Sequence, residues 1–144
     1  MGKIGIRDDI INKVGKLDEE EFRQIQLHPV FGDQILSSIR QSPYLSEGAR
    51  YHHERYDGRG YPDGLRGEEI PEVARIIAVA DAYDAMTSKR SYRAPLPQEK
   101  VREELERGLG AQFDPRYARI MLRFIDQDVD YRMRETARTE GRTP

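Results

Sequence analysis

Apolar residues recur along most of the chain at the three- and four-residue spacing of amphipathic helices, and no segment shows the two-residue alternation of a strand. The segment 17–26 follows this pattern, with Asp18 as a candidate N-cap and acidic residues in the next turn. The pattern restarts after a histidine, where Pro29 suits a first helical turn. We therefore expect helices over about 17–26 and 29–39.

The next apolar pattern covers residues 45–56 and predicts a third helix with Ser46 as its cap. This helix would contain the adjacent histidines His52 and His53. The connection from 57 to 69 holds four glycines and two Asp-Gly pairs, which are typical of turns. At this length the connection exceeds most loops between bundled helices, and long loops are often functional.

Three further helices are expected towards the C-terminus. The first covers about 71–88, with Pro71 at its first position, and the second covers 97–110. The third covers 114–127 and begins with an Asp-Pro pair suited to a cap and a first turn. The fold class is therefore predicted to be all-α, a bundle of about five to seven helices. We expect a domain over 1–127 and a polar, frayed tail over 128–144.

Composition narrows the possible functions. The chain has 144 residues and no cysteine, so disulfides are excluded and a transition metal would need His, Asp or Glu ligands. No stretch has the length and apolar character of a membrane span or a signal peptide, which suggests a cytoplasmic protein. The net charge of −2 argues against a nucleic-acid polymer as a partner.

The histidines are the first candidate chemistry, because the chain has only three: His28, His52 and His53. Successive residues of a helix diverge by about 100°, so adjacent histidines would not readily chelate one ion together. They would reach two ions lying side by side, an arrangement that hydrolyses phosphoesters. The alternative is a pair of surface histidines near a helix end.

Asp81 and Asp84 are the second candidate. They lie three apart in a segment whose apolar residues cover nearly every helical face, so we expect the helix to be largely buried. A buried carboxylate needs a cation or several hydrogen bonds. Either a metal ion or a structural ion pair with Arg75 or Arg90 would meet that need, and the residues alone leave both open.

The third group of candidates consists of aromatic and basic residues that follow the histidine pair and the aspartate pair in the sequence. Tyr61, followed by a proline, offers an aromatic face for stacking a base, and Lys89, Arg90 and Arg93 could hold phosphate. The competing interpretation is a simple glycine-rich turn for the segment with Tyr61, and a solvated, charged turn for the segment with the three basic residues.

Three stretches together resemble a known family. "HHERYDGRGYPDGLRGEEIP", "RIIAVADAYDAMTSKRSYR" and "GAQFDP" are similar to the HD-GYP subgroup of the HD superfamily, which consists of bacterial metal-dependent phosphodiesterases that open cyclic di-GMP. The resemblance covers roughly residues 2–125 and includes the tripeptide that names the subgroup. It implies an HD-type helical bundle and a cyclic dinucleotide substrate. It also implies a possible diguanylate cyclase or other signalling domain as a partner.

The resemblance further implies roles for individual residues. The metal ligands of a bi- or trinuclear iron or manganese centre would be His28, His52, His53 and Asp81. The substrate pocket would contain Tyr61, Asp84, Arg90 and Arg93, and the lysine near the metal-bound phosphate would be Lys3. The motif loop would comprise Asp57, Gly58, Gly60, Tyr61 and Pro62.

One departure from the family's pattern sets a further expectation. The histidine–aspartate doublet that names the superfamily should lie immediately before Gly2, where this chain has Met1. The family's preceding helices are missing as well. We therefore expect weak or absent metal binding and little hydrolysis by these 144 residues. The alternative function is a degenerate module that binds cyclic di-GMP or docks on a signalling partner.

Overall fold

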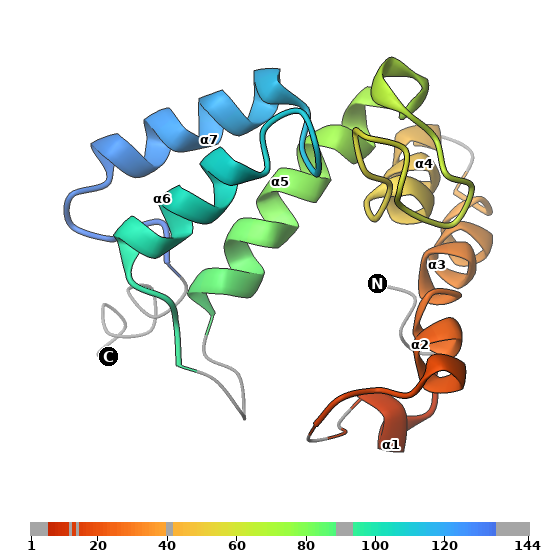
Figure 1. The fold of residues 1–144 in the computed structure, drawn as a ribbon. Helices are drawn as coiled ribbons and strands as arrows, with labels where there is room; N and C mark the ends of the chain where they lie inside the picture. The colour runs from red at the N-terminus through yellow and green to blue at the C-terminus, as the bar shows by residue number, and fades with distance from the viewer. Residues whose placement is uncertain (1–5, 12, 14, 40–41, 89–93, 135–144) are drawn as a thin grey trace, which may run out of the picture. The chain divides into compact units, whose positions relative to one another are not determined.

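The computed structural model describes residues 6–134, apart from 12, 14, 40–41 and 89–93, and it is helical as expected. No strand occurs among these residues; one isolated bridge joins Leu109 to Phe113. The chain divides into two compact units, 1–77 and 78–144 (Figure 1). The boundary falls within helix α5 (Glu72–Thr87), and each unit is described by itself below.

In the described part of the first unit, four α-helices and a short 3₁₀ turn, η2, precede the start of α5. Their bounds are α1 Asp8–Ile11, α2 Glu19–Ile25, α3 His28–Leu36, α4 Pro43–Tyr51 and η2 Gly67–Glu69. Helix α2 begins with the predicted cap: the Asp18 carboxylate accepts from the Glu21 backbone N–H at 2.9 Å, and the Glu21 carboxylate accepts from the Asp18 N–H at 2.8 Å. This reciprocal pair satisfies two N–H groups that the helix itself cannot bond.

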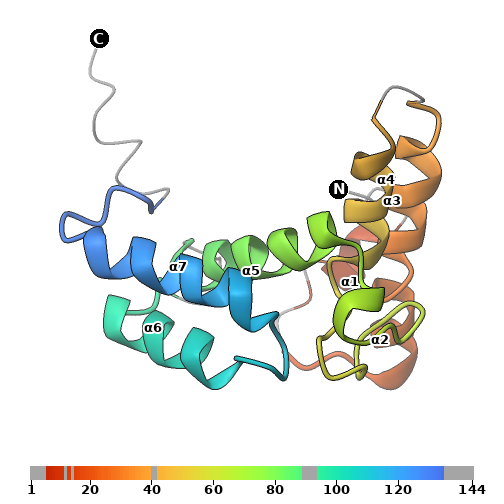
Figure 2. The same cartoon turned by 90° about the horizontal axis from the view of Figure 1, so that it is seen from above.

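Helices α3 and α4 pack side by side and form the scaffold of the first unit (Figures 1 and 2). Gly48 lies on the buried side of α4. A Cβ atom there would approach the Cδ1 atom of Ile77 to 2.6 Å, so the start of α5 can pack against α4 only because this residue is glycine.

Helix α4 differs from its prediction at both ends. It begins at Pro43, with Ser42 preceding it, and the Ser46 hydroxyl donates back to the Pro43 carbonyl instead of capping a helix start. It ends at Tyr51, so the third helix is present but its predicted extension to residue 56 is wrong, and neither His52 nor His53 is helical. The end of α4 determines where these two side chains point.

The second unit packs the C-terminal part of α5 with α6 (Gln98–Arg107) and α7 (Pro115–Gln127) (Figure 2). Side chains from all three helices and the α6–α7 connection build its core: Val79, Tyr83, Val101, Leu105, Phe113, Ala118, Leu122 and Ile125. The expected cap of α7 is present, because Asp114 accepts from the Arg116 N–H at 2.8 Å and a proline follows it. The Asp128 carboxylate accepts from two backbone N–H groups just beyond α7.

Helix α5 has the expected length but not the expected burial. Its first helical residue is Glu72, one beyond Pro71. Val79, Tyr83 and Thr87 follow one another at four-residue spacing and are buried, whereas Asp81, Asp84, Ile76 and Ala80 are exposed. The prediction of a largely buried helix is therefore wrong: the core covers one stripe of α5, and small alanines do not require burial of the rest.

Candidate metal centre

The imidazoles of His28, His52 and His53 converge in the first unit. His28 is the first residue of α3, and the other two directly follow α4. One ring nitrogen from each lies within 4.8 Å of the corresponding atom of the other two. His28 is only 4% exposed, and the rings of His52 and His53 are 4.1 Å apart between centroids. Three of the four expected metal ligands thus lie together, whereas Asp81, the fourth, belongs to the second unit.

Backbone carbonyls orient two of the rings. The Nδ1 atom of His28 lies 2.6 Å from the Ile25 carbonyl oxygen, and that of His52 lies 2.9 Å from the Ala49 carbonyl oxygen. A carbonyl oxygen can only accept, so each Nδ1 carries the proton and the lone pair remains on Nε2. Metal-binding histidines are commonly held in this way, with one nitrogen bonded to the protein and the other turned to the ion.

The third ring faces the first. The Nε2 atoms of His53 and His28 are 3.1 Å apart, and because His28 accepts there, His53 is the donor. Two nitrogens bound to adjacent positions of one ion would have a similar separation, since metal–nitrogen bonds are about 2.0–2.1 Å. A cation attracted to both lone pairs would replace the proton between them. The donor set and its spacing therefore fit a metal ion that accepts nitrogen ligands.

The end of α4 explains why adjacent histidines can share a site. Side chains of successive residues in a helix point about 100° apart, and this was expected of His52 and His53. Both residues lie beyond the end of α4, so the expectation does not apply to them. The Glu54 N–H donates to the Tyr51 carbonyl at 2.9 Å in a turn, and the chain then leaves the helix axis. Both rings consequently reach the same cluster as His28, and all three can contact a single ion.

The loop after the histidines folds back onto them. The Tyr61 N–H donates to the His53 carbonyl at 3.3 Å. A Cβ atom on Gly60 would lie 2.3 Å from the Arg55 nitrogen and 2.6 Å from the His53 carbonyl oxygen. Such an approach is possible only without a side chain. The glycine of the Gly-Tyr-Pro tripeptide thus allows direct backbone contact between the loop and a candidate ligand.

The ring of Tyr61 packs against a candidate metal ligand. The ring stacks on His53, with centroids 5.0 Å apart and planes at 24°, and Phe22 of α2 meets it edge-on at 6.5 Å. A candidate metal ligand thus covers one face of the Tyr61 ring. A base could stack only on the part of the ring that this contact leaves accessible. A role of Tyr61 in substrate binding stays a prediction.

Glu54 is a functional candidate that the sequence interpretation missed. Its side chain is 3% exposed, and its Oε1 atom accepts from the backbone N–H groups of Asp63 and Gly64 at 2.7 and 3.0 Å. Its Oε2 atom is buried and has no hydrogen-bond partner among the described residues. Glu54 directly follows the histidine pair in the sequence, and its carboxylate holds the loop at Asp63 and Gly64. Its place next to the pair in "HHE" is the sequence signal that could have identified it.

Ion pairs complete the attachment of the loop. Arg50 of α4 contacts Asp63 at 3.1 Å and Asp33 of α3 at 3.3 Å, which joins the loop to both scaffold helices. Arg55 contacts Asp57 at 2.7 Å. This hydrogen-bonded pair, together with the Arg59 N–H, lowers the pKa of Asp57 from 3.8 to about 2. Ion pairs and hydrogen bonds therefore hold this glycine-rich loop in a specific conformation.

The remaining predicted site residues are not brought together with the histidines by any described contact. Asp81 and Asp84 belong to the second unit and are exposed, so the argument from burial does not hold for them. Lys3, Arg90 and Arg93 lie outside the described residues. Their roles remain predictions based on the resemblance alone.

Comparison with known proteins identifies the class of this chain. The HD domain family profile matches residues 1–117, and the chain belongs to the HD domain family. The expected resemblance to the HD superfamily, and the all-α fold that it implies, are confirmed.

Several curated relatives are similar over most of this chain. It is 41% identical over 134 residues to 3'3'-cGAMP-specific phosphodiesterase 2 of Vibrio cholerae, covering 92% of this chain and 26% of that protein. It is 45% identical to the cyclic di-GMP phosphodiesterase response regulator RpfG of Xanthomonas campestris, covering 85% and 33%. It is 43% identical to a cyclic di-GMP phosphodiesterase of Thermotoga maritima, covering 94% and 37%. The chain thus spans 26–37% of the length of these relatives.

A solved structure shares the fold. The crystal structure of a cyclic GMP-AMP-specific phosphodiesterase from Vibrio cholerae aligns with a TM-score of 0.62 and 22% identity, covering 78% of this chain and 26% of the other. Among the described residues, no helix has both the length and the apolar character that crossing a membrane would require.

Proposed function

We propose that this chain forms part of a metal-dependent phosphodiesterase that hydrolyses cyclic di-GMP. The observation that carries the proposal is the cluster of three imidazoles whose ligand atoms lie within 4.8 Å of one another. Relatives that are 41–45% identical and are named as cyclic di-GMP or cGAMP phosphodiesterases support the substrate class.

The chain's own residues would contribute binding and orientation. His28, His52 and His53 would hold iron or manganese, and Asp81 would complete the ligand set. Bound metal in such sites lowers the pKa of a bound water and stabilises negative charge on a phosphate. Tyr61, stacked on His53, would keep that ring in its binding orientation. The resemblance assigns Asp84, Arg90 and Arg93 to substrate and Lys3 to the phosphate.

A chimera tests the proposal most directly. Residues 1–117 would replace the matching segment of the Thermotoga maritima phosphodiesterase, and hydrolysis of cyclic di-GMP would be followed by chromatography with manganese or iron present. We expect the chimera to hydrolyse the substrate and His53→Ala in the chimera to lose about 100-fold or more in rate, because a ligand is removed.

The unmodified Thermotoga enzyme is the positive control, and thermal melting checks that each chimera folds. A folded chimera that binds manganese but does not hydrolyse cyclic di-GMP would contradict the proposal. If that chimera bound the nucleotide without turnover, the chain would instead be a binding module. Hydrolysis of 3'3'-cGAMP in strong preference to cyclic di-GMP would retain the chemistry and correct the substrate.

A further inference from the structure

Three arginines form a stripe along the exposed side of α7 in the second unit. Arg116, Arg119 and Arg123 are exposed and spaced by three and four residues, so they follow one another along one face of the helix. At a rise of 1.5 Å per residue the stripe extends over about 10 Å. None of these arginines belongs to the candidate metal centre.

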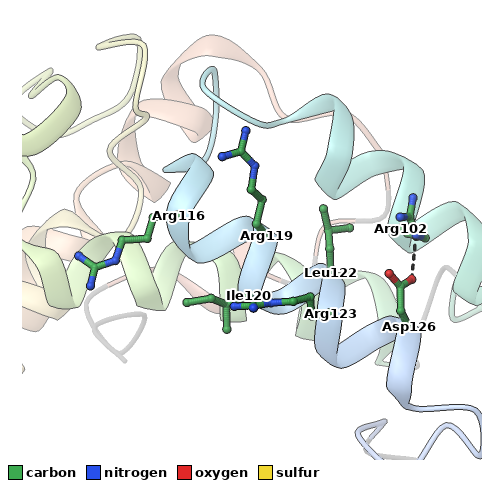
Figure 3. A pocket seen from close by; sticks show the side chains of 7 residues that line it. All are labelled: Arg102, Arg116, Arg119, Ile120, Leu122, Arg123 and Asp126. Carbon is green, nitrogen blue, oxygen red and sulfur yellow. Dashed lines mark hydrogen bonds and ion pairs between the residues drawn. The ribbon is translucent and has the colours of Figure 1, made fainter.

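The stripe borders an open groove of about 620 Å³ between α6 and α7 (Figure 3). Leu122 and Ile120 provide apolar surface in it. At one end of the groove Arg102 is paired with Asp126 at 2.9 Å and with Glu106 at 3.0 Å, and Arg116 lies at the other end. Charge is therefore balanced at the Arg102 end of the groove.

The middle of the groove has uncompensated positive charge. The guanidinium groups of Arg119 and Arg123 make no hydrogen bond or ion pair with any other described residue, unlike that of Arg102. Like charges four residues apart on a helix repel each other, so an anion placed against both would remove an unfavourable interaction. Guanidinium groups bind carboxylates and phosphates in paired hydrogen bonds.

The surroundings favour an acidic protein segment over a polyanion. Residues 78–144 hold 12 acidic and 13 basic side chains, so their net charge of +1 is too small to favour binding to a long phosphate backbone. Ile120 and Phe124 form an apolar pair at four-residue spacing beside the stripe, and Phe124 is 51% exposed. Basic and apolar rows side by side match an amphipathic helix that has acidic and apolar rows of the same spacing.

We propose that this groove docks an amphipathic helix of a partner protein. That helix would carry carboxylates spaced by three and four residues opposite Arg116, Arg119 and Arg123, with apolar residues against Ile120 and Phe124. The carboxylates would determine orientation and the rate of association, and the apolar contacts would exclude water from the ion pairs.

The test uses the full 144-residue chain and a synthetic helical peptide with glutamates at that spacing beside a row of leucines. Binding is measured by fluorescence anisotropy, together with a scrambled peptide of identical composition. We expect the patterned peptide to bind and the double variant R119E/R123E to lose about tenfold or more in affinity. Replacing the peptide's glutamates by lysines should restore binding to that variant.

Arg107→Glu is the matched control, because Arg107 lies on α6, is exposed and does not line the groove. Circular dichroism checks that all variants keep their helical content. The proposal is overturned if the scrambled peptide binds equally well or if R119E/R123E keeps full affinity. It is also overturned if single-stranded DNA binds more tightly than the peptide. Loss of a dimer in R119E/R123E, without any peptide binding, would assign the groove to a second copy of the chain.

Discussion

The Nε2 atoms of His28 and His53 face each other across 3.1 Å, although the two residues are 25 positions apart in the sequence. The His28 ring is held from behind by the Ile25 carbonyl, and the His53 ring is held by Tyr61 stacked against it. Two ring nitrogens fixed so close to each other, with a third histidine beside them, favour a cation at this position.

Removal of either facing ring should therefore weaken metal binding. We expect His28→Ala and His53→Ala each to reduce the affinity for manganese by about tenfold or more, because one nitrogen ligand is lost. Isothermal titration calorimetry measures this, and manganese should raise the melting temperature of the unmodified chain but not of the variants. Arg23→Ala on the exposed surface of α2 is the control. Equal affinities in all four proteins would mean that the cluster does not bind the ion.

Glu54 should stabilise the loop through its two backbone hydrogen bonds. Glu54→Ala leaves the N–H groups of Asp63 and Gly64 without their acceptor, and we expect a loss of about 2–4 kcal/mol in the free energy of unfolding. Glu54→Gln retains an acceptor oxygen, so its loss should be smaller. Urea unfolding measures both values. If the two variants unfold at the same urea concentration as the parent, the buried carboxylate does not hold the loop.

Gly60→Ala should displace the loop from His53. The added Cβ would lie 2.3 Å from the Arg55 nitrogen, so the backbone must move, at a cost of about 1–3 kcal/mol in stability. We also expect weaker manganese binding, because the contacts that hold His53 are lost. The control is Gly67→Ala, where φ is +58° but a Cβ meets nothing within 4 Å. That variant should lose stability without losing metal affinity, and the same metal affinity in Gly60→Ala would contradict the positioning role.

The Asp57 carboxylate provides a test by pH. Its pKa is lowered from 3.8 to about 2, first by the hydrogen bond from Arg55, so the charged form is favoured in the folded state. The resulting stabilisation is complete above about pH 3.8 and is lost as the pH falls through about 2. In an NMR titration the Asp57 side-chain carboxyl should show no midpoint between pH 5 and 3. Arg55→Met should return the midpoint towards 3.8; a midpoint there in the parent would contradict the ion pair.

Local sequence signals were sufficient for two of the helix caps. Asp18 and Asp114 were predicted as caps and act as caps, because an N-cap depends only on a side chain and the next few backbone N–H groups. The histidines were singled out by residue type and by their adjacency. The resemblance to HD domains came from local motifs, and the family match confirms it.

Tertiary contacts decided the features that the sequence did not reveal. The end of α4 could not be placed from residues 45–56, because the loop competes for the His53 carbonyl through Tyr61, a contact across eight residues. The burial of α5 was overestimated, because the apolar composition of a helix does not determine which of its faces pack against other elements.

The sequence by itself therefore determined which side chains are available, the all-α fold class and the family to which the chain belongs. Only the tertiary structure decided that His28 and His53 meet, that Glu54 is buried beneath the loop, and that Arg119 and Arg123 remain without an anion among the described residues. The physical reason is the range of the interactions. Caps and helical periodicity act within a few residues, whereas these relationships depend on the packing of segments that are distant in the chain.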